Sequence, residues 1–192
     1  MLKIPGRRTS RKVAVGEPLY EPEFLDAETG LPGPGLFMDL VQRDIERSLR
    51  SGSEMTLIVF DVVTAGFIPT ATEPEPPSVA PAVASILQDI VRRSDVPARL
   101  GQFRFAVLLS SAEQPGAEQF NERIRTRIGT DPYARDKAGN AIHARAWAGA
   151  TPWGPQFERA DDYVAAAVHA MNETRAGYEQ VQDWFKGTDL KT

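Results

Sequence analysis

The chain places apolar residues at helical spacing in four segments. In the first segment, charged residues separate five apolar ones, which are Leu36, Leu40, Val41, Ile45 and Leu49. Because positions three and four apart lie on one face of an α-helix, this spacing predicts amphipathic helices. The predicted helices cover residues 35–50, 79–93, 115–129 and 158–174.

Three other segments have the composition of β-strands. Residues 55–60 are a continuous apolar run rich in β-branched side chains, which is typical of a buried central strand, and Asp61 marks its predicted end. Residues 99–109 indicate a hairpin of two short strands, and residues 142–151 alternate as a further strand would. Residues 69–81 contain five prolines, which lack the N–H that helices and sheets require, so most of this segment is predicted to be a loop before the helix at residues 79–93.

The order of these elements predicts the fold class. Helices and strands alternate around one hairpin, which indicates an α/β sandwich with helices flanking a central mixed sheet. A chain of 192 residues has room for one domain with a full hydrophobic core and short tails. We expect a flexible basic arm over residues 1–24, the domain over residues 25–178 and a C-terminal tail over residues 179–192.

Charge is distributed unevenly along the chain. The net charge is -4, yet five basic residues precede the first acidic residue, Glu17. A basic tail can contact nucleic acid, anionic lipid or an acidic partner, but a solvated terminus is the simpler interpretation. Nucleic acid is therefore not an expected partner.

Several other classes of protein are excluded or disfavoured. Cysteine is absent, which excludes disulfides and thiolate metal sites. The longest apolar stretch, residues 55–68, is too short to cross a bilayer and contains Asp61. The N-terminus lacks the apolar region of a signal peptide. We therefore predict no membrane span and a cytoplasmic location.

Three short motifs follow one another along the predicted domain. The sequence DAETGLP opens it at residues 26–32, LIVFD at residues 57–61 forms the first strand, and GQFRF at residues 101–105 lies at the hairpin. This ordered set resembles the GGDEF domain of bacterial diguanylate cyclases, over residues 25–178. The resemblance implies the nucleotidyl cyclase-like α/β fold in a degenerate form, because only the first glycine and the last phenylalanine of the signature remain.

The resemblance also implies that catalysis is lost. Joining two GTP molecules requires divalent metal, and hard cations need clustered oxygen ligands. The third and fourth positions of the family signature are acidic, whereas here they are Phe103 and Arg104, so the local charge is inverted and a metal is repelled. Asp61 matches a family metal ligand, but alone it is expected to cap the strand end or to be solvated. We predict no metal, no cofactor and no cyclase activity.

Other substrate contacts of the family also lack counterparts. The region that recognises guanine in the family corresponds to an acidic, proline-rich loop at residues 72–77. The family's phosphate-binding lysine aligns with Thr174, and the arginine after it aligns with Tyr178. Contacts to base and phosphate are therefore expected to be missing as well.

The inhibitory product site of the family is matched better. Diguanylate cyclases bind cyclic di-GMP through an RxxD motif five residues before the signature, and Arg92-Arg93-Ser94-Asp95 stands at that offset, while a further site arginine aligns with Arg123. A guanidinium grips phosphate oxygens or the guanine edge, and an aspartate accepts from guanine N–H donors. The predicted ligand residues are thus Arg92, Asp95 and Arg123. A solvated helix C-terminus is the structural alternative for the motif's arginines.

Two functions from different classes remain open. The first is a non-catalytic cyclic di-GMP receptor that regulates a protein partner or its own dimerisation. The second is an interaction scaffold on the same fold that binds no nucleotide. An active cyclase is a third and disfavoured possibility.

Overall fold

The computed structural model describes residues 24–65, 71–72, 75–111 and 114–188. Side chains are described within these ranges up to residue 177, except at residue 114. Apart from Phe24, the predicted basic arm lies outside the described residues.

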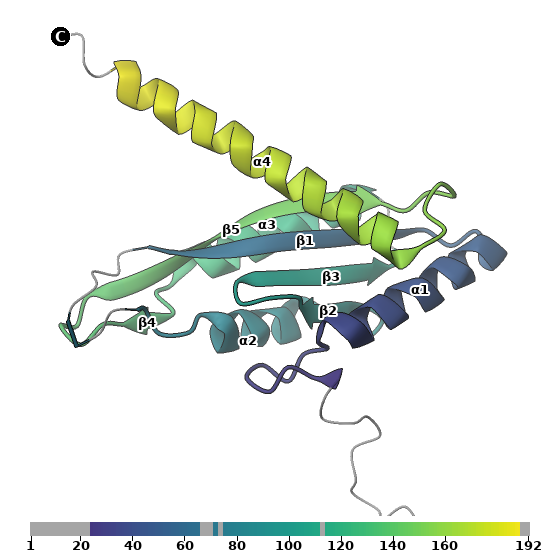
Figure 1. The fold of residues 1–192 in the computed structure, drawn as a ribbon, viewed down its shortest axis with the longest axis horizontal. Coiled ribbons are helices and arrows are strands. Elements are labelled where there is room, and N and C mark those ends of the chain that lie inside the picture. Colours follow the sequence, from purple (N-terminus) through teal and green to yellow (C-terminus); the bar gives the residue numbers. More distant parts are fainter. Residues whose placement is uncertain (1–23, 66–70, 73–74, 112–113, 189–192) are drawn as a thin grey trace, which may run out of the picture.

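Four helices and five strands make up the described part of the chain (Figure 1). The helices are α1 (Pro34–Ser51), α2 (Ala80–Ile90), α3 (Gln114–Thr130) and α4 (Ala160–Thr188). The strands are β1 (Met55–Ala65), β2 (Val96–Arg99), β3 (Arg104–Ser110), β4 (Ala134–Arg135) and β5 (Ala141–Pro152). The four predicted helices, the hairpin and the two other strands are confirmed, although β2 overlaps the range predicted for the hairpin, residues 99–109, only at Arg99. The two-residue strand β4 was not predicted.

The strands form one sheet in the order β2-β3-β1-β5-β4, and every neighbouring pair is antiparallel. The α/β class with flanking helices is confirmed, but the prediction of a mixed sheet is wrong. Strand β2 runs in the same direction as β1, but β3 folds back and lies between them. Each strand therefore meets only antiparallel neighbours.

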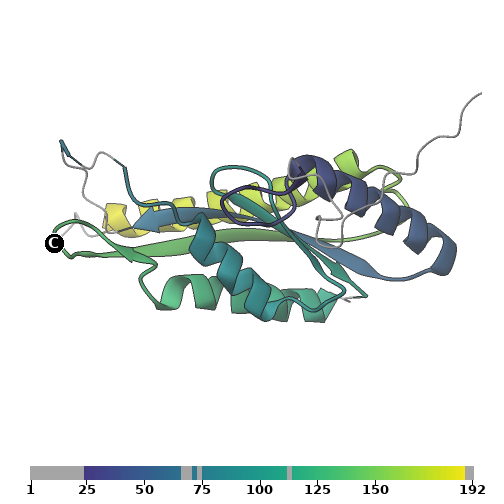
Figure 2. The same cartoon turned by 90° about the horizontal axis from the view of Figure 1, so that it is seen from below.

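Helices cover both faces of this sheet (Figures 1 and 2). Alternate residues of β1 point to opposite faces: Ile58 and Phe60 join a core with α2 and α3, and Leu57 and Val59 join a core with α1 and α4. All four side chains are fully buried. The continuous apolar run in the sequence is explained by this burial on both faces.

Helix α4 lies very close to β5 at Gly149. A Cβ atom added to this glycine would lie 2.1 Å from the backbone nitrogen of Met171. Nearby, the buried Tyr163 hydroxyl donates to the carbonyl oxygen of Thr151 over 2.9 Å, and burial raises the pKa of this phenol. The position of α4 is therefore fixed both by close backbone packing and by a buried hydrogen bond.

Some element ends differ from the prediction. Strand β1 continues to Ala65 by pairing with β5, so Asp61 lies inside the strand and not at its end. Helix α2 ends at Ile90, because Val91 is extended with ψ 148°. Helix α4 continues to Thr188, through most of the range predicted as a tail. None of the helices in the described ranges is both long and apolar enough to span a bilayer.

Candidate ligand-binding site

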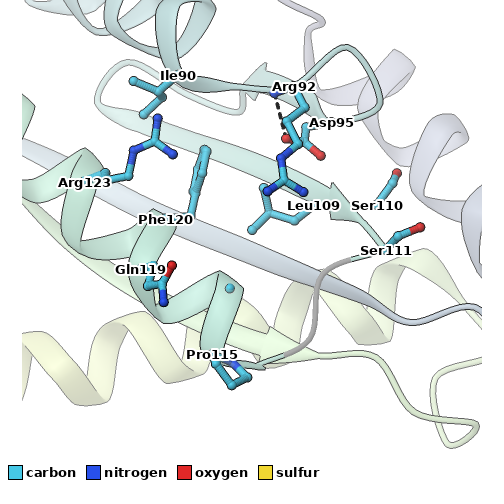
Figure 3. Close-up of a pocket in the computed structure, with 11 residues that line it drawn as sticks. Ile90, Arg92, Asp95, Leu109, Ser110, Ser111, Pro115, Gln119, Phe120 and Arg123 are labelled. Carbon is cyan, nitrogen blue, oxygen red and sulfur yellow. Dashed lines mark hydrogen bonds between the residues drawn. The ribbon is translucent and has the colours of Figure 1, made fainter.

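The three predicted ligand residues line one pocket. Arg92, Asp95 and Arg123 surround a cavity of about 290 Å³ between the end of α2, the end of β3 and the first half of α3 (Figure 3). Leu109 and Phe120 contribute apolar surface to the same cavity. Arg92 and Arg123, which are 31 positions apart in the sequence, thus line the same pocket. Their role as ligand contacts stays a prediction.

A short turn holds Arg92 and Asp95 in place. Because α2 ends at Ile90, the motif lies on the connection to β2 and not in the last helical turn. The Asp95 carboxylate accepts the backbone N–H of Arg92 over 2.9 Å, and the Asp95 N–H donates to the Arg92 carbonyl over 3.0 Å. These two bonds close the turn formed by residues 92–95, and they leave the Arg92 side chain free to point at the cavity (Figure 3).

Arg123 reaches the pocket from α3. That helix packs on the sheet through Phe120, Ile124 and other buried apolar residues, and Arg123 lies on the exposed side of this apolar face. In Figure 3 the guanidinium groups of Arg92 and Arg123 lie on either side of the Phe120 ring. Within the described ranges, neither of these two arginines forms an ion pair. A cavity with apolar surface and two arginines that form no ion pair favours a ligand that is anionic and partly aromatic.

The hairpin turn contains a different arrangement of charges. Asp61 on β1 lies directly opposite Arg104 on β3, and the two side chains form a bidentate ion pair with N–O distances of 2.7 and 2.9 Å. Asp61 is 16% exposed and Arg104 is 37% exposed. The hydrogen bond to Asp61 raises the pKa of the Arg104 guanidinium, so its charge is retained. The prediction of a capping or solvated Asp61 is wrong.

The residues at this turn do not fit a divalent cation. Arg104 occupies both carboxylate oxygens of Asp61, which are the atoms that would bind a metal. Phe103, 40% exposed, adds an apolar ring where the family has an acid. Over the described ranges, no three His, Cys, Asp or Glu side chains are grouped as a metal site would require. Magnesium needs several oxygen ligands, and a paired carboxylate beside a guanidinium does not supply them.

One arginine near this turn was missed by the sequence reasoning. Arg175 on α4 lines a groove of about 340 Å³ together with Asp61 and Phe103. It follows Thr174, which aligned with the family's phosphate-binding lysine and whose hydroxyl instead donates to the carbonyl of Ala170. A shift of one residue in that alignment would have identified Arg175. The side chain of Tyr178 and part of the loop 72–77 lie outside the described residues.

The opening motif docks against the hairpin. Thr29 donates from its backbone N–H and its hydroxyl to Asp26, and Arg99 on β2 binds Asp26 at 2.9 Å and Glu28 at 2.6 Å. Burial raises the pKa of Asp26, but hydrogen bonds from Thr29 and Arg99 lower it by more, so the pKa is below its ordinary value. Arg99 also donates to the carbonyl of Gly101. Through Arg99, the motif at residues 26–32 is thus connected to Gly101, the first residue of the motif at residues 101–105.

Comparisons with known proteins agree with this fold. The family model described as diguanylate cyclase, GGDEF domain, matches residues 78–180. The diguanylate cyclase DgcP of Pseudomonas aeruginosa is 27% identical over an alignment of 156 residues, and the match covers 76% of this chain and 22% of DgcP. The chain thus spans about a fifth of that relative.

Solved structures show the same architecture. The GGDEF domain of DgcB from Caulobacter crescentus, solved in complex with cyclic di-GMP, has a TM-score of 0.69 and 19% identity, covering 89% of this chain and 94% of that one. The diguanylate cyclase SiaD of Pseudomonas aeruginosa, solved with its activator SiaC, has a TM-score of 0.70 and 22% identity, covering 80% of this chain and 58% of SiaD. At these identities the likeness concerns the fold, and the predicted fold is confirmed.

Proposed function

Because the chain belongs to the GGDEF domain family of diguanylate cyclases, we propose that it is a receptor for cyclic di-GMP that does not synthesise this molecule. The observation that carries the proposal is the convergence of Arg92, Asp95 and Arg123 on one pocket. DgcB, a relative in fold, was solved with cyclic di-GMP bound. A location in the cytoplasm remains a prediction from the sequence.

The chemistry of the pocket suits this ligand. Cyclic di-GMP carries two phosphates and two guanines, and a guanidinium binds either phosphate oxygens or the O6/N7 edge of guanine with two parallel hydrogen bonds. The Asp95 carboxylate has acceptor capacity beyond its bond to the Arg92 N–H, so it can accept from guanine N1 and N2. A cavity of about 290 Å³ accommodates a base together with its phosphate, with the remainder of the ligand at the surface.

The lack of synthesis is supported by the hairpin turn. Arg104 neutralises Asp61, and Phe103 replaces a second acidic ligand. Without an oxygen cluster there is no magnesium to bind the triphosphate or to activate the attacking hydroxyl. We expect no cyclic di-GMP to form when the protein is incubated with GTP and Mg²⁺, as measured by chromatography of the nucleotides. Formation of the product would refute this part of the proposal.

Isothermal titration of the 192-residue chain with cyclic di-GMP tests the receptor function. Each charge-assisted bond contributes about 1.5–3 kcal/mol, so Arg92→Ala or Arg123→Ala should weaken binding roughly 10- to 100-fold. Arg93→Ala is the matched control, because this neighbouring exposed arginine does not line the pocket. Absence of heat with the wild-type chain would remove the receptor and favour the nucleotide-independent scaffold. Equal affinities of the Arg92→Ala and Arg93→Ala variants would remove the site.

The consequence of binding is proposed to be a change in assembly. A ligand with two guanines and two phosphates presents more contacts than one shallow pocket uses, so its free half is available to a second copy of the chain or to a protein partner. Light scattering with and without cyclic di-GMP measures this directly. An increase in mass to twice the monomer indicates self-association, whereas an unchanged mass leaves regulation of another protein as the expected role.

A further inference from the structure

A buried hydroxyl connects the candidate pocket to α1. Ser110, the last residue of β3, lines the pocket and is 7% exposed. Its Oγ lies 2.9 Å from the carbonyl oxygen of Ser94, which belongs to the 92–95 turn, and 3.2 Å from Oδ2 of Asp44 on α1. One side chain therefore contacts both the turn that carries the ligand residues and a helix on the opposite face of the sheet.

The two contacts compete for a single proton. A serine hydroxyl has one hydrogen to donate, and both the Ser94 carbonyl and the Asp44 carboxylate are pure acceptors. The carboxylate is the stronger acceptor because it is charged. However, the same Oδ2 also accepts from Arg47 at 3.1 Å, and the carbonyl is the nearer of the two oxygens. The hydroxyl can therefore donate either to Ser94 in the turn or to Asp44 on α1, and the two distances do not favour one acceptor strongly over the other.

We infer that Ser110 is a positioning residue for the cyclic di-GMP site and that Asp44 competes with the 92–95 turn for its proton. The inference rests on the proposed function. When the Ser110 hydroxyl donates to the Ser94 carbonyl, this hydrogen bond fixes the 92–95 turn that positions Arg92 and Asp95. This state binds the ligand better. Because coupling between two sites is reciprocal, a bound ligand in turn withdraws the hydroxyl from Asp44. Occupancy of the pocket is thereby transmitted to α1.

Titration of four variants with cyclic di-GMP tests the inference in the 192-residue chain. Ser110→Ala should weaken binding about 3- to 10-fold, the value of one buried hydrogen bond, and Ser110→Thr should restore it because the hydroxyl is kept. Asp44→Ala should tighten binding about 2- to 5-fold, since the proton is then committed to Ser94. Arg50→Ala, an exposed position of the same helix, should leave binding unchanged. Urea unfolding of each variant verifies that it is folded.

Hydrogen exchange without ligand separates this inference from the receptor proposal. The backbone N–H groups of Arg92 and Asp95 close the turn, so they should exchange faster in Ser110→Ala and slower in Asp44→Ala than in the wild type. If the wild-type chain binds no cyclic di-GMP, the proposed function fails, while these exchange rates still test the competition. Unchanged exchange in Ser110→Ala overturns the positioning role. Asp44→Ala rates that are equal to or faster than wild type overturn the competition.

Discussion

Replacing Arg104 by alanine tests whether a guanidinium has become part of the fold at the hairpin turn. The substitution removes two hydrogen bonds to Asp61, of 2.7 and 2.9 Å, and leaves a carboxylate that is 16% exposed without its partner. A buried charge that loses its partner keeps its desolvation cost, which is why such truncations destabilise more than exposed ones. The stability of the domain should therefore depend on Arg104.

The expected magnitude is moderate. Arg104 is itself 37% exposed, so solvent screens part of the attraction, and the loss should be about 1–2 kcal/mol and not the larger cost of a fully buried pair. For a domain of this size that corresponds to a decrease in Tm of roughly 2–8 °C. Arg159→Ala is the control, because this arginine also pairs with an aspartate, Asp161, but through a single bond of 3.0 Å between side chains that are both about 70% exposed. That control should lose less than about 0.5 kcal/mol.

Urea unfolding followed by circular dichroism gives the free energies of unfolding. A double-mutant cycle with Asp61→Ala isolates the ion pair from the packing of the arginine stem, and we expect a coupling energy of about 1 kcal/mol. A coupling near zero, or an Arg104→Ala loss no larger than that of Arg159→Ala, would refute the reasoning. The ion pair would then be a surface contact without energetic weight.

Three further predictions concern packing, pH and metal binding. Gly149→Ala should destabilise the domain by about 3 kcal/mol or should displace α4, because its Cβ would lie 2.1 Å from a backbone nitrogen of that helix; thermal unfolding measures the loss. Despite the burial of Asp26, hydrogen bonds lower its pKa, so its contribution to stability is complete above its unfolded pKa of about 4 and is lost as the pH falls through the lower folded value. In Asp26→Asn the free energy of unfolding should therefore fall less steeply with decreasing pH than in the wild type. An unchanged decrease at acid pH would contradict this. Phe103→Asp combined with Arg104→Glu should create a divalent-cation site, seen as a rise in Tm with Mg²⁺ that the wild-type chain does not show.

The hydrophobic pattern predicted the elements well because most of them are buried in a regular way. Helix α1 turns one apolar stripe to the core, and β1 is apolar throughout because helices cover both faces of the sheet. Strand pairing was less accessible, since nothing in the local pattern shows that β3 lies between β1 and β2. The two-residue strand β4 is too short to have a period, and α4 continues past Thr174 through Gly177, a residue that often ends a helix.

The pocket at Arg92 and Asp95 could be predicted from the sequence, whereas the ion pair at the hairpin turn could not, because it depends on the register of two paired strands. Arg92 and Asp95 lie within a single turn, so their spacing alone determines that they act together. Asp61 and Arg104 are 43 positions apart and meet only because β1 and β3 pair with these two residues opposite each other. Without that register, Asp61 looked like an isolated acid and Arg104 like a cation that repels metal. The register shows that the two residues form one feature. In the family the acid at this position binds a metal cation, whereas here Asp61 binds the positively charged side chain of Arg104. The ion pair thus ties β1 to β3 at the hairpin turn, and we expect this contact to hold the shape of the turn without a bound metal.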